Sequence, residues 1–200
     1  MALTSYALTT VARVKTRAGI SVSTFDTLLE ALICAVTDWV ESYCDRRFVL
    51  TQYTNEVYSG DGQRFVVLKQ APITELTSAQ YRVGTPDNPT WTDFLASEYE
   101  IVGDGSSGMI RIYNSAPHGT NNLRFTYKAG YTLNLTTITS NNLPLDLVDL
   151  VERIVVKSFK KRQSEGKSSE TAGEAQVTWD KEFSKEDYLT LNRHKRVFLG

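Results

Sequence analysis

The sequence predicts an α+β fold in which one short and two long helices form a bundle, with an antiparallel β region inserted between the long helices and a flexible C-terminal arm. Apolar residues recur every three or four positions in two long segments, 23–46 and 143–162. Between them, short alternating runs rich in Val, Ile, Phe and Tyr are separated by turn sequences. The predicted parts are 1–47 (N-terminal helices), 48–140 (inserted β region), 141–163 (last bundle helix) and 164–200 (linker and arm).

The composition is that of an ordinary globular protein. The chain has 200 residues, 41% hydrophobic and 22% charged, with a formal net charge of -1. This balance gives no overall electrostatic reason to expect nucleic acid or an anionic membrane as a partner. No run reaches the ~18 apolar residues that a membrane-spanning helix needs, and the start MALTSYALTT lacks the pattern of a signal peptide. We therefore expect a cytosolic protein with no membrane partner.

The helical segments carry recognisable end signals. A short helix over 8–19 would begin at Thr9 or Thr10 and end at Gly19. The second helix would start from a capping box formed by Ser23 and Asp26. In the third, Pro144 suits the first turn.

The β region begins near Phe48. The runs EYEIV and MIRIY flank GDGSSG, which predicts a hairpin with a loop longer than two residues. RFVVLK is also a predicted strand, and its partner stays open.

After Arg162 the chain reads QSEGKSSETAGEAQ, which predicts a flexible or extended linker. Beyond it a helix is expected from Ser184, and large apolar residues reappear without enough of them to form a core. Such a tail docks either on its own domain or on a partner. The anchors are Trp179, Phe183, Tyr188, Leu191, Val197 and Phe198.

The sequence contains no motif for catalysis, a metal or a cofactor. Cys34 and Cys44 lie ten residues apart on one predicted helix, about 15 Å, which is too far for a disulfide. The only histidines, His118 and His194, are not adjacent to a cysteine, and both GDG sequences read as turns. We expect no enzyme activity, although a nucleophile built from Cys44 and a remote histidine stays open as the less favoured alternative.

Two charged groups on the last long helix have plain structural explanations. Asp146, Asp149 and Glu152 are spaced as a solvated face or as partners of the helix dipole. The basic run at the end of the helix suits the dipole as well, but it could also contact phosphates without sequence preference. That run consists of Lys157, Lys160, Lys161 and Arg162.

The stretch YCDRRF, residues 43–48, lies where helical spacing stops and β alternation begins. We interpret it as a helix-to-strand corner, with Phe48 starting the first strand. Asp45, Arg46 and Arg47 would then pair with neighbours or with an adjacent subunit.

These pieces occur in a characteristic order: a short helix ending in Gly-Ile, the long helix LLEALICAVTDWVESYCDRRF, Ala-Pro-Ile-Thr-Glu-Leu, TYKAGY, a Leu-Pro-Leu-Asp-Leu helix start and RHKRVF. In this order the chain resembles the head-tail connector (adaptor, or head-completion) proteins of tailed bacteriophages. YCDRRF is the most specific piece, and the large β block departs from the smaller, mostly helical members.

The resemblance implies a non-enzymatic ring, commonly a dodecamer, beneath the portal protein in the neck of the virion and assembled in the host cytoplasm. The ring would extend the DNA channel, meet a tail-side connector or tail terminator, and engage the portal through its C-terminal segment. Two other functions stay open: a sequence-independent nucleic-acid-binding module acting through the basic run, and a tail-completion subunit of similar build.

Overall fold

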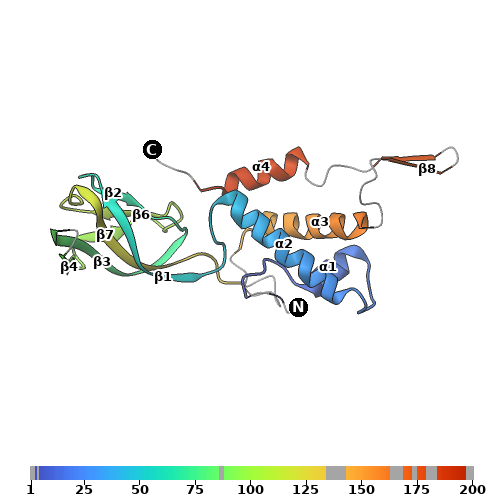
Figure 1. The fold of residues 1–200 in the computed structure, drawn as a ribbon, viewed down its shortest axis with the longest axis horizontal. Helices are drawn as coiled ribbons and strands as arrows, with labels where there is room; N and C mark the ends of the chain where they lie inside the picture. Colours follow the sequence, from blue (N-terminus) through green and yellow to red (C-terminus); the bar gives the residue numbers. More distant parts are fainter. Residues whose placement is uncertain are drawn as a thin grey trace. The chain divides into compact units, whose positions relative to one another are not determined.

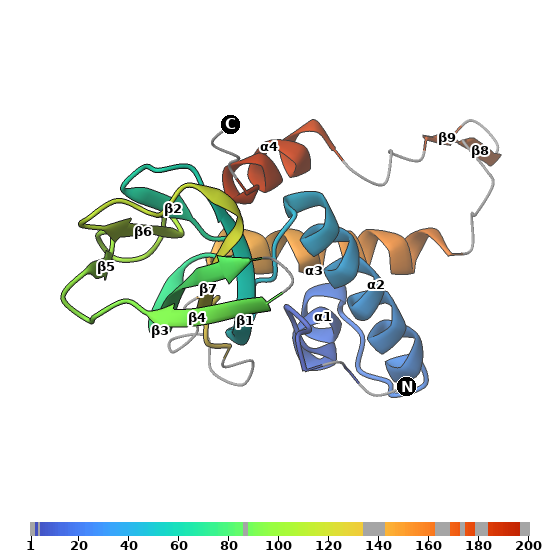
Figure 2. The same cartoon turned by 60° about the vertical axis from the view of Figure 1, so that its left-hand side comes forward.

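The computed structural model describes residues 3, 5–85, 88–133, 143–162, 169–172, 175–178 and 184–196. The chain divides into two compact units, seen in Figures 1 and 2. The helical unit comprises Met1–Asp45 and Leu133–Arg196, and the β unit comprises Arg46–Thr132 with Val197–Gly200. Each unit is held together by its own core.

In its described residues, the helical unit contains four helices. They are α1 (Val11–Ala18), α2 (Asp26–Cys44), α3 (Leu145–Lys161) and α4 (Lys185–His194). The N-terminal end of α2 lies beside the C-terminal end of α3, because the rings of Phe25 and Phe159 are 5.2 Å apart, so these two helices are antiparallel. Their apolar faces supply most of this core. The buried positions include Leu29, Ile33, Val36 and Val40 in α2 and Leu147, Leu150, Val151, Ile154 and Val155 in α3.

The signals at both ends of α1 are confirmed, and the signal at the start of α2 is wrong. Thr10 caps α1 by accepting a hydrogen bond from the Arg13 amide, and Gly19 ends it in the left-handed conformation. The capping box of Ser23 and Asp26 is absent, because α2 begins at Asp26 and Phe25 takes the capping position. The Asp26 carboxylate instead accepts a hydrogen bond from Lys15 Nζ, 2.8 Å away, which ties the start of α2 to α1.

The β unit has two antiparallel sheets. The first has the order β1 (Thr51–Gly60), β7 (Gly119–Ala129), β3 (Ile73–Thr85), β4 (Asn88–Asp93). The second has the order β2 (Phe65–Val67), β6 (Met109–Ile112), β5 (Tyr99–Ile101). The predicted hairpin across GDGSSG is confirmed as β5 and β6, and β2 finds its partner in β6. A separate pair, β8 (Ser169–Ala172) and β9 (Ala175–Thr178), belongs to the helical unit and forms where the sequence predicted a linker.

The predicted fold class was wrong. The β region is not a subsidiary insertion in a helical bundle, because its two sheets enclose a hydrophobic core of their own. Strand β7, at the centre of the larger sheet, alternates Leu123, Phe125 and Tyr127 toward that core. A face of large alternating side chains can be buried against a second sheet without help from helices, so the strands form an independent unit. The fourth helix, α4, is the one expected from Ser184, and the Ser184 side chain caps it by accepting a hydrogen bond from the Asp187 amide.

A partly buried cluster of polar side chains joins β1, β7 and the segment after β2. The hydroxyls of Tyr58 and Tyr127 both donate hydrogen bonds to Oε2 of Glu56, the latter at 2.6 Å, and Lys69 Nζ lies 3.4 Å from Oε1 of the same carboxylate. Desolvation, followed by the hydrogen bond to Glu56, raises the pKa of both phenols well above the ordinary value near 10. The cluster therefore favours the protonated phenols over a wide pH range.

We expect the free energy of unfolding to fall progressively above pH about 10. In that range the unfolded chain releases its phenolic protons while folded Tyr58 and Tyr127 keep theirs, so stability present below pH about 10 is lost as the pH rises. Urea denaturation at a series of pH values measures the slope. Tyr127→Phe should flatten it, and an unchanged slope in that variant would contradict this role of the cluster.

Candidate functional site

The C-terminal helix α4 docks on α2 and α3 within the helical unit. Leu191 is fully buried, and its carbonyl oxygen lies 3.7 Å from Sγ of Cys44 at the end of α2. The Tyr188 ring packs against Trp39 and Tyr43, with centroid distances of 6.2 and 5.6 Å. The end of α2 is therefore a docking surface for an aromatic and an aliphatic side chain.

Polar contacts fix the register of α4. Asn192 Oδ1 accepts a hydrogen bond from the Tyr43 hydroxyl at 2.9 Å. Asp187, which is nearly fully buried, pairs with Arg153 of α3 at 3.0 Å, and His194 Nε2 lies 2.9 Å from Asp146 Oδ2. Asp187, near the start of α4, pairs with Arg153 in the middle of α3, and His194, at the end of α4, pairs with Asp146 at the start of α3. Helix α4 therefore runs antiparallel to α3. Since α2 is also antiparallel to α3, α4 is parallel to α2.

The structure describes only part of the predicted arm. Tyr188 and Leu191 lie in α4, where they contact the chain's own helices. The sequence left open whether the tail docks on its own domain or on a partner, and helix α4 docks on its own domain. The other anchors, Trp179, Phe183, Val197 and Phe198, lie outside the described residues. Sequence reasoning did not single out Leu189, which is 56% exposed on α4.

The basic residues at the end of α3 have different surroundings: some contact side chains of the helical unit, and Lys160 is exposed to solvent. Lys157 Nζ lies 3.9 Å from Asp187 of α4. The Arg162 guanidinium lies over the rings of Phe159 and Phe25, 3.8 and 5.0 Å from their centroids, at the end of the helical unit. Lys160 is exposed. The run is therefore not one continuous stripe for phosphates.

The YCDRRF stretch is a corner, as predicted, and the division between the two units falls within it, after Asp45. Asp45 ends α2 in the left-handed conformation, with φ 51° and ψ 43°. Arg46 donates to the carbonyl oxygen of Ala71 and lies 5.0 Å over the Phe48 ring, and the Arg47 amide donates to Gln70. Phe48 is buried ahead of the first strand, which begins at Thr51.

In the described part of the chain neither cysteine forms a disulfide, and Cys44 is a small buried residue of the helical core. Within the described residues, no group of three His, Cys, Asp or Glu side chains could hold a metal ion. In the second GDG sequence, the Asp104 carboxylate accepts the Ser106 amide at 3.0 Å, and hydrogen bonds from Ser106 lower its pKa. Asp104 is therefore a turn residue, as its sequence context predicted. Among the helices that the structure describes, none is both long and apolar enough to cross a membrane.

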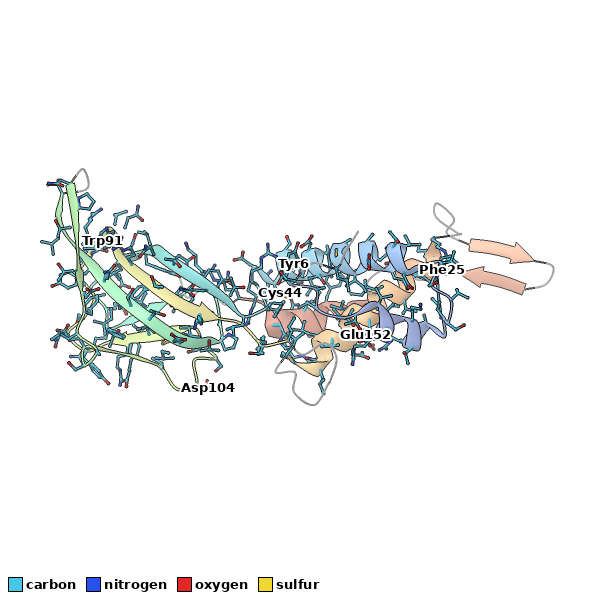
Figure 3. The ribbon with its side chains drawn as sticks, turned by 90° about the horizontal axis from the view of Figure 1, so that it is seen from below. Tyr6, Phe25, Cys44, Trp91, Asp104 and Glu152 are labelled. Carbon is cyan, nitrogen blue, oxygen red and sulfur yellow. The ribbon has the colours of Figure 1, made fainter. Side chains whose placement is uncertain are left out.

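The interpretation of the α3 carboxylates as a solvated face is wrong for Glu152. This residue is buried between α3 and α1, where Oε1 lies 2.6 Å from Nε of Arg13 and 3.0 Å from the hydroxyl of Thr9 (Figure 3). Arg17 of α1 also contacts this helix: its guanidinium lies 3.5 Å from Oε2 of Glu152 and 2.6 Å from Oδ1 of Asp149. The arginines at positions 13 and 17, one helical turn apart, were the sequence signal for this contact.

Comparison with known proteins places these features in a family. The family model described as "Head completion protein" matches residues 7–197. No curated protein sequence matches the chain.

Among solved structures, a chain from the neck of an empty gene transfer agent particle with C6 symmetry matches at a TM-score of 0.63 and 16% identity. Chains from the native virion and from the native neck with C12 symmetry each match at a TM-score of 0.56 and 15% identity. Each match covers 100% of this chain and 94% of the other. The family match spans most of the chain, including the end of α2, the β unit and α4, so the chain belongs to the head completion protein family and has the structural role of a head-tail connector.

Proposed function

We propose that the chain forms a ring, commonly a dodecamer, in the neck of a virion, beneath the portal protein and above a tail-side connector or terminator. In this position the ring extends the channel for DNA and provides the platform for the tail. The observation that carries the proposal is the family match over residues 7–197. The fold likeness to chains from necks with C6 and C12 symmetry supports the ring, since rings arise when one face of each subunit meets a different face of the next.

The role proposed for this protein is structural, with no catalytic step. Assembly would take place in the host cytoplasm before the protein becomes part of the virion. DNA would pass through the ring without lasting contact, for which the formal net charge of -1 is suitable. Lys157 and Arg162 of the basic run contact side chains of their own subunit, which favours a structural role for them over contact with DNA.

The C-terminal arm is proposed to bind the portal through Trp179, Phe183, Val197 and Phe198. Tyr188 and Leu191 would join them only if α4 left its docking surface. Helix α4 has one fully buried apolar side chain, Leu191, whereas α3 buries a whole apolar face, so the attachment of α4 is weaker than that of α3. Portal binding would then order the arm and bring neighbouring subunits into register.

We expect the combined change Trp179→Ser and Phe183→Ser to weaken portal binding by roughly 100-fold or more, since buried aromatic anchors dominate interface energies. Binding of the purified protein to its cognate portal is measured by biolayer interferometry. A point variant is a sharper test than truncation at Arg162, because truncation would also uncover Cys44 and Tyr43.

Tyr113→Ser is the matched control, because Tyr113 is an exposed aromatic residue of the β unit and should leave the affinity unchanged. Full affinity in the double variant would disprove the arm proposal. The family assignment and the ring would be unaffected by that result.

A further inference from the structure

Helix α4 is joined to α3 by a connection much longer than its position requires. The two helices are antiparallel neighbours, and Nζ of Lys157, four residues before the end of α3, lies 3.9 Å from Asp187, near the start of α4. The end of α3 and the start of α4 are therefore about one helix spacing apart, ~8–10 Å. Antiparallel neighbours are usually joined by about 2–8 residues. Here 22 residues, 162–183, lie between Lys161 and Ser184.

The connection is long enough to reach the helical unit of a second copy. Residues 169–178 contain the hairpin of β8 and β9, in which Ser169 pairs with Thr178, so this part adds little distance between its ends. The seven residues 162–168 and the five residues 179–183 would span up to ~40 Å when fully extended. A helix with its side chains is about 10–12 Å across, so this reach exceeds the width of three packed helices.

The surface on which α4 docks would receive the same helix from another copy equally well. Helix α4 meets Cys44 and Tyr43 at the end of α2, and its buried Asp187 pairs with Arg153 of α3. These contacts involve residues of α4 itself rather than of the connection. The docking energy is therefore the same whichever copy supplies the helix, and the length of the connection decides which surfaces it can reach.

Helix α4 depends on docking, yet it is held loosely enough to exchange. Its ten residues are fewer than the ~12–15 that an isolated helix needs in water. Leu191 is its one fully buried apolar side chain, whereas Tyr188 and Leu189 are 37% and 56% exposed. In a closed ring each copy can pass its α4 to the next, and every docking surface stays filled.

We infer that α4 is exchanged between neighbouring subunits. In the ring it docks on α2 and α3 of the adjacent copy, with the contacts that it makes to its own α2 and α3 in the free chain. This inference rests on the proposed ring and adds an element that ties its subunits together. Tyr188 and Leu191 then contact the neighbouring subunit, and the portal is bound by the other arm residues.

The test uses the Tyr43 and Tyr188 rings, whose centroids are 5.6 Å apart, close enough for coupling into dityrosine by a ruthenium photosensitiser with persulfate. Tyr43→Phe and Tyr188→Phe each remove one partner and keep the ring, so neither full-length variant can form this link by itself. In a mixture, the link forms only where α4 of the first variant docks on α2 of the second. Rings are assembled on portal from the equimolar mixture, checked by mass photometry, and the linked peptides are identified by mass spectrometry. Rings of each variant alone are the matched controls.

We expect mixed rings to give the Tyr43–Tyr188 link, joining two chains, at about a quarter of the yield in rings of unaltered protein, because half of the helices keep Tyr188 and half of the surfaces keep Tyr43. Mixed rings that lack the link would overturn the exchange and leave the ring intact. Rings of unaltered protein in which the link stays within single chains would overturn it as well. If the unaltered protein forms no ring, alone or on portal, the proposed ring and the exchange are both wrong.

Discussion

Gly105→Ala should destabilise the β unit by at least ~3 kcal/mol. Gly105 adopts φ +78° in the loop between β5 and β6, and a β-carbon there would lie 2.1 Å from the carbonyl oxygen of Ile73. The Ile73 amide also donates a hydrogen bond to the Gly105 carbonyl oxygen at 2.9 Å, so the two backbones cannot separate without losing it. The loop is therefore attached directly to the start of β3, and only glycine fits at the contact.

Gly103→Ala is the matched control in the same loop. Its φ of +61° is similar, but a β-carbon there has no atom within 4 Å, so only the backbone strain of about 1–2 kcal/mol should remain. Urea denaturation gives the free energies, and hydrogen exchange of β7 against α3 tells which unit is weakened. Equal losses in the two variants would show that close backbone contact is not what constrains Gly105.

Glu152→Ala should destabilise the helical unit by about 2–3 kcal/mol. The substitution removes the buried carboxylate that pairs with the Arg13 guanidinium and accepts a hydrogen bond from the Thr9 hydroxyl. The Arg13 side chain is 25% exposed, whereas Thr9 is fully buried. Partial solvent access to Arg13 keeps the expected loss below that of a fully buried pair. Thermal or urea unfolding, with hydrogen exchange of α1 and α3, measures the effect.

Two comparisons test this explanation. Asp149→Ala removes a carboxylate from the same helix, but that side chain is 51% exposed, so the loss should stay below about 1 kcal/mol. The combined change Arg13→Met and Glu152→Leu removes both charges of the pair and should recover most of the stability. A double variant as unstable as Glu152→Ala would show that packing, rather than the unpaired charge, causes the loss.

The sequence predicted the local elements well. Thr10 and Gly19 mark the ends of α1, and the runs EYEIV and MIRIY form the hairpin of β5 and β6, because caps and turns depend on residues that are near in the chain. The order of short motifs also indicated the connector family, which the family match confirms. The fold class was wrong because periodicity shows that a strand has a buried face but not what covers it.

By itself, the sequence determined which segments become helices, the hairpin of β5 and β6, where several helices end, and the family to which the chain belongs. Only the tertiary structure decided that the strands enclose their own core, that Glu152 is buried beside Arg13, and that α4 docks on the end of α2. The physical reason is distance along the chain. Cys44 meets Leu191, and Arg13 meets Glu152, across separations at which no local pattern constrains the partner, so these contacts are determined by the packing of whole surfaces.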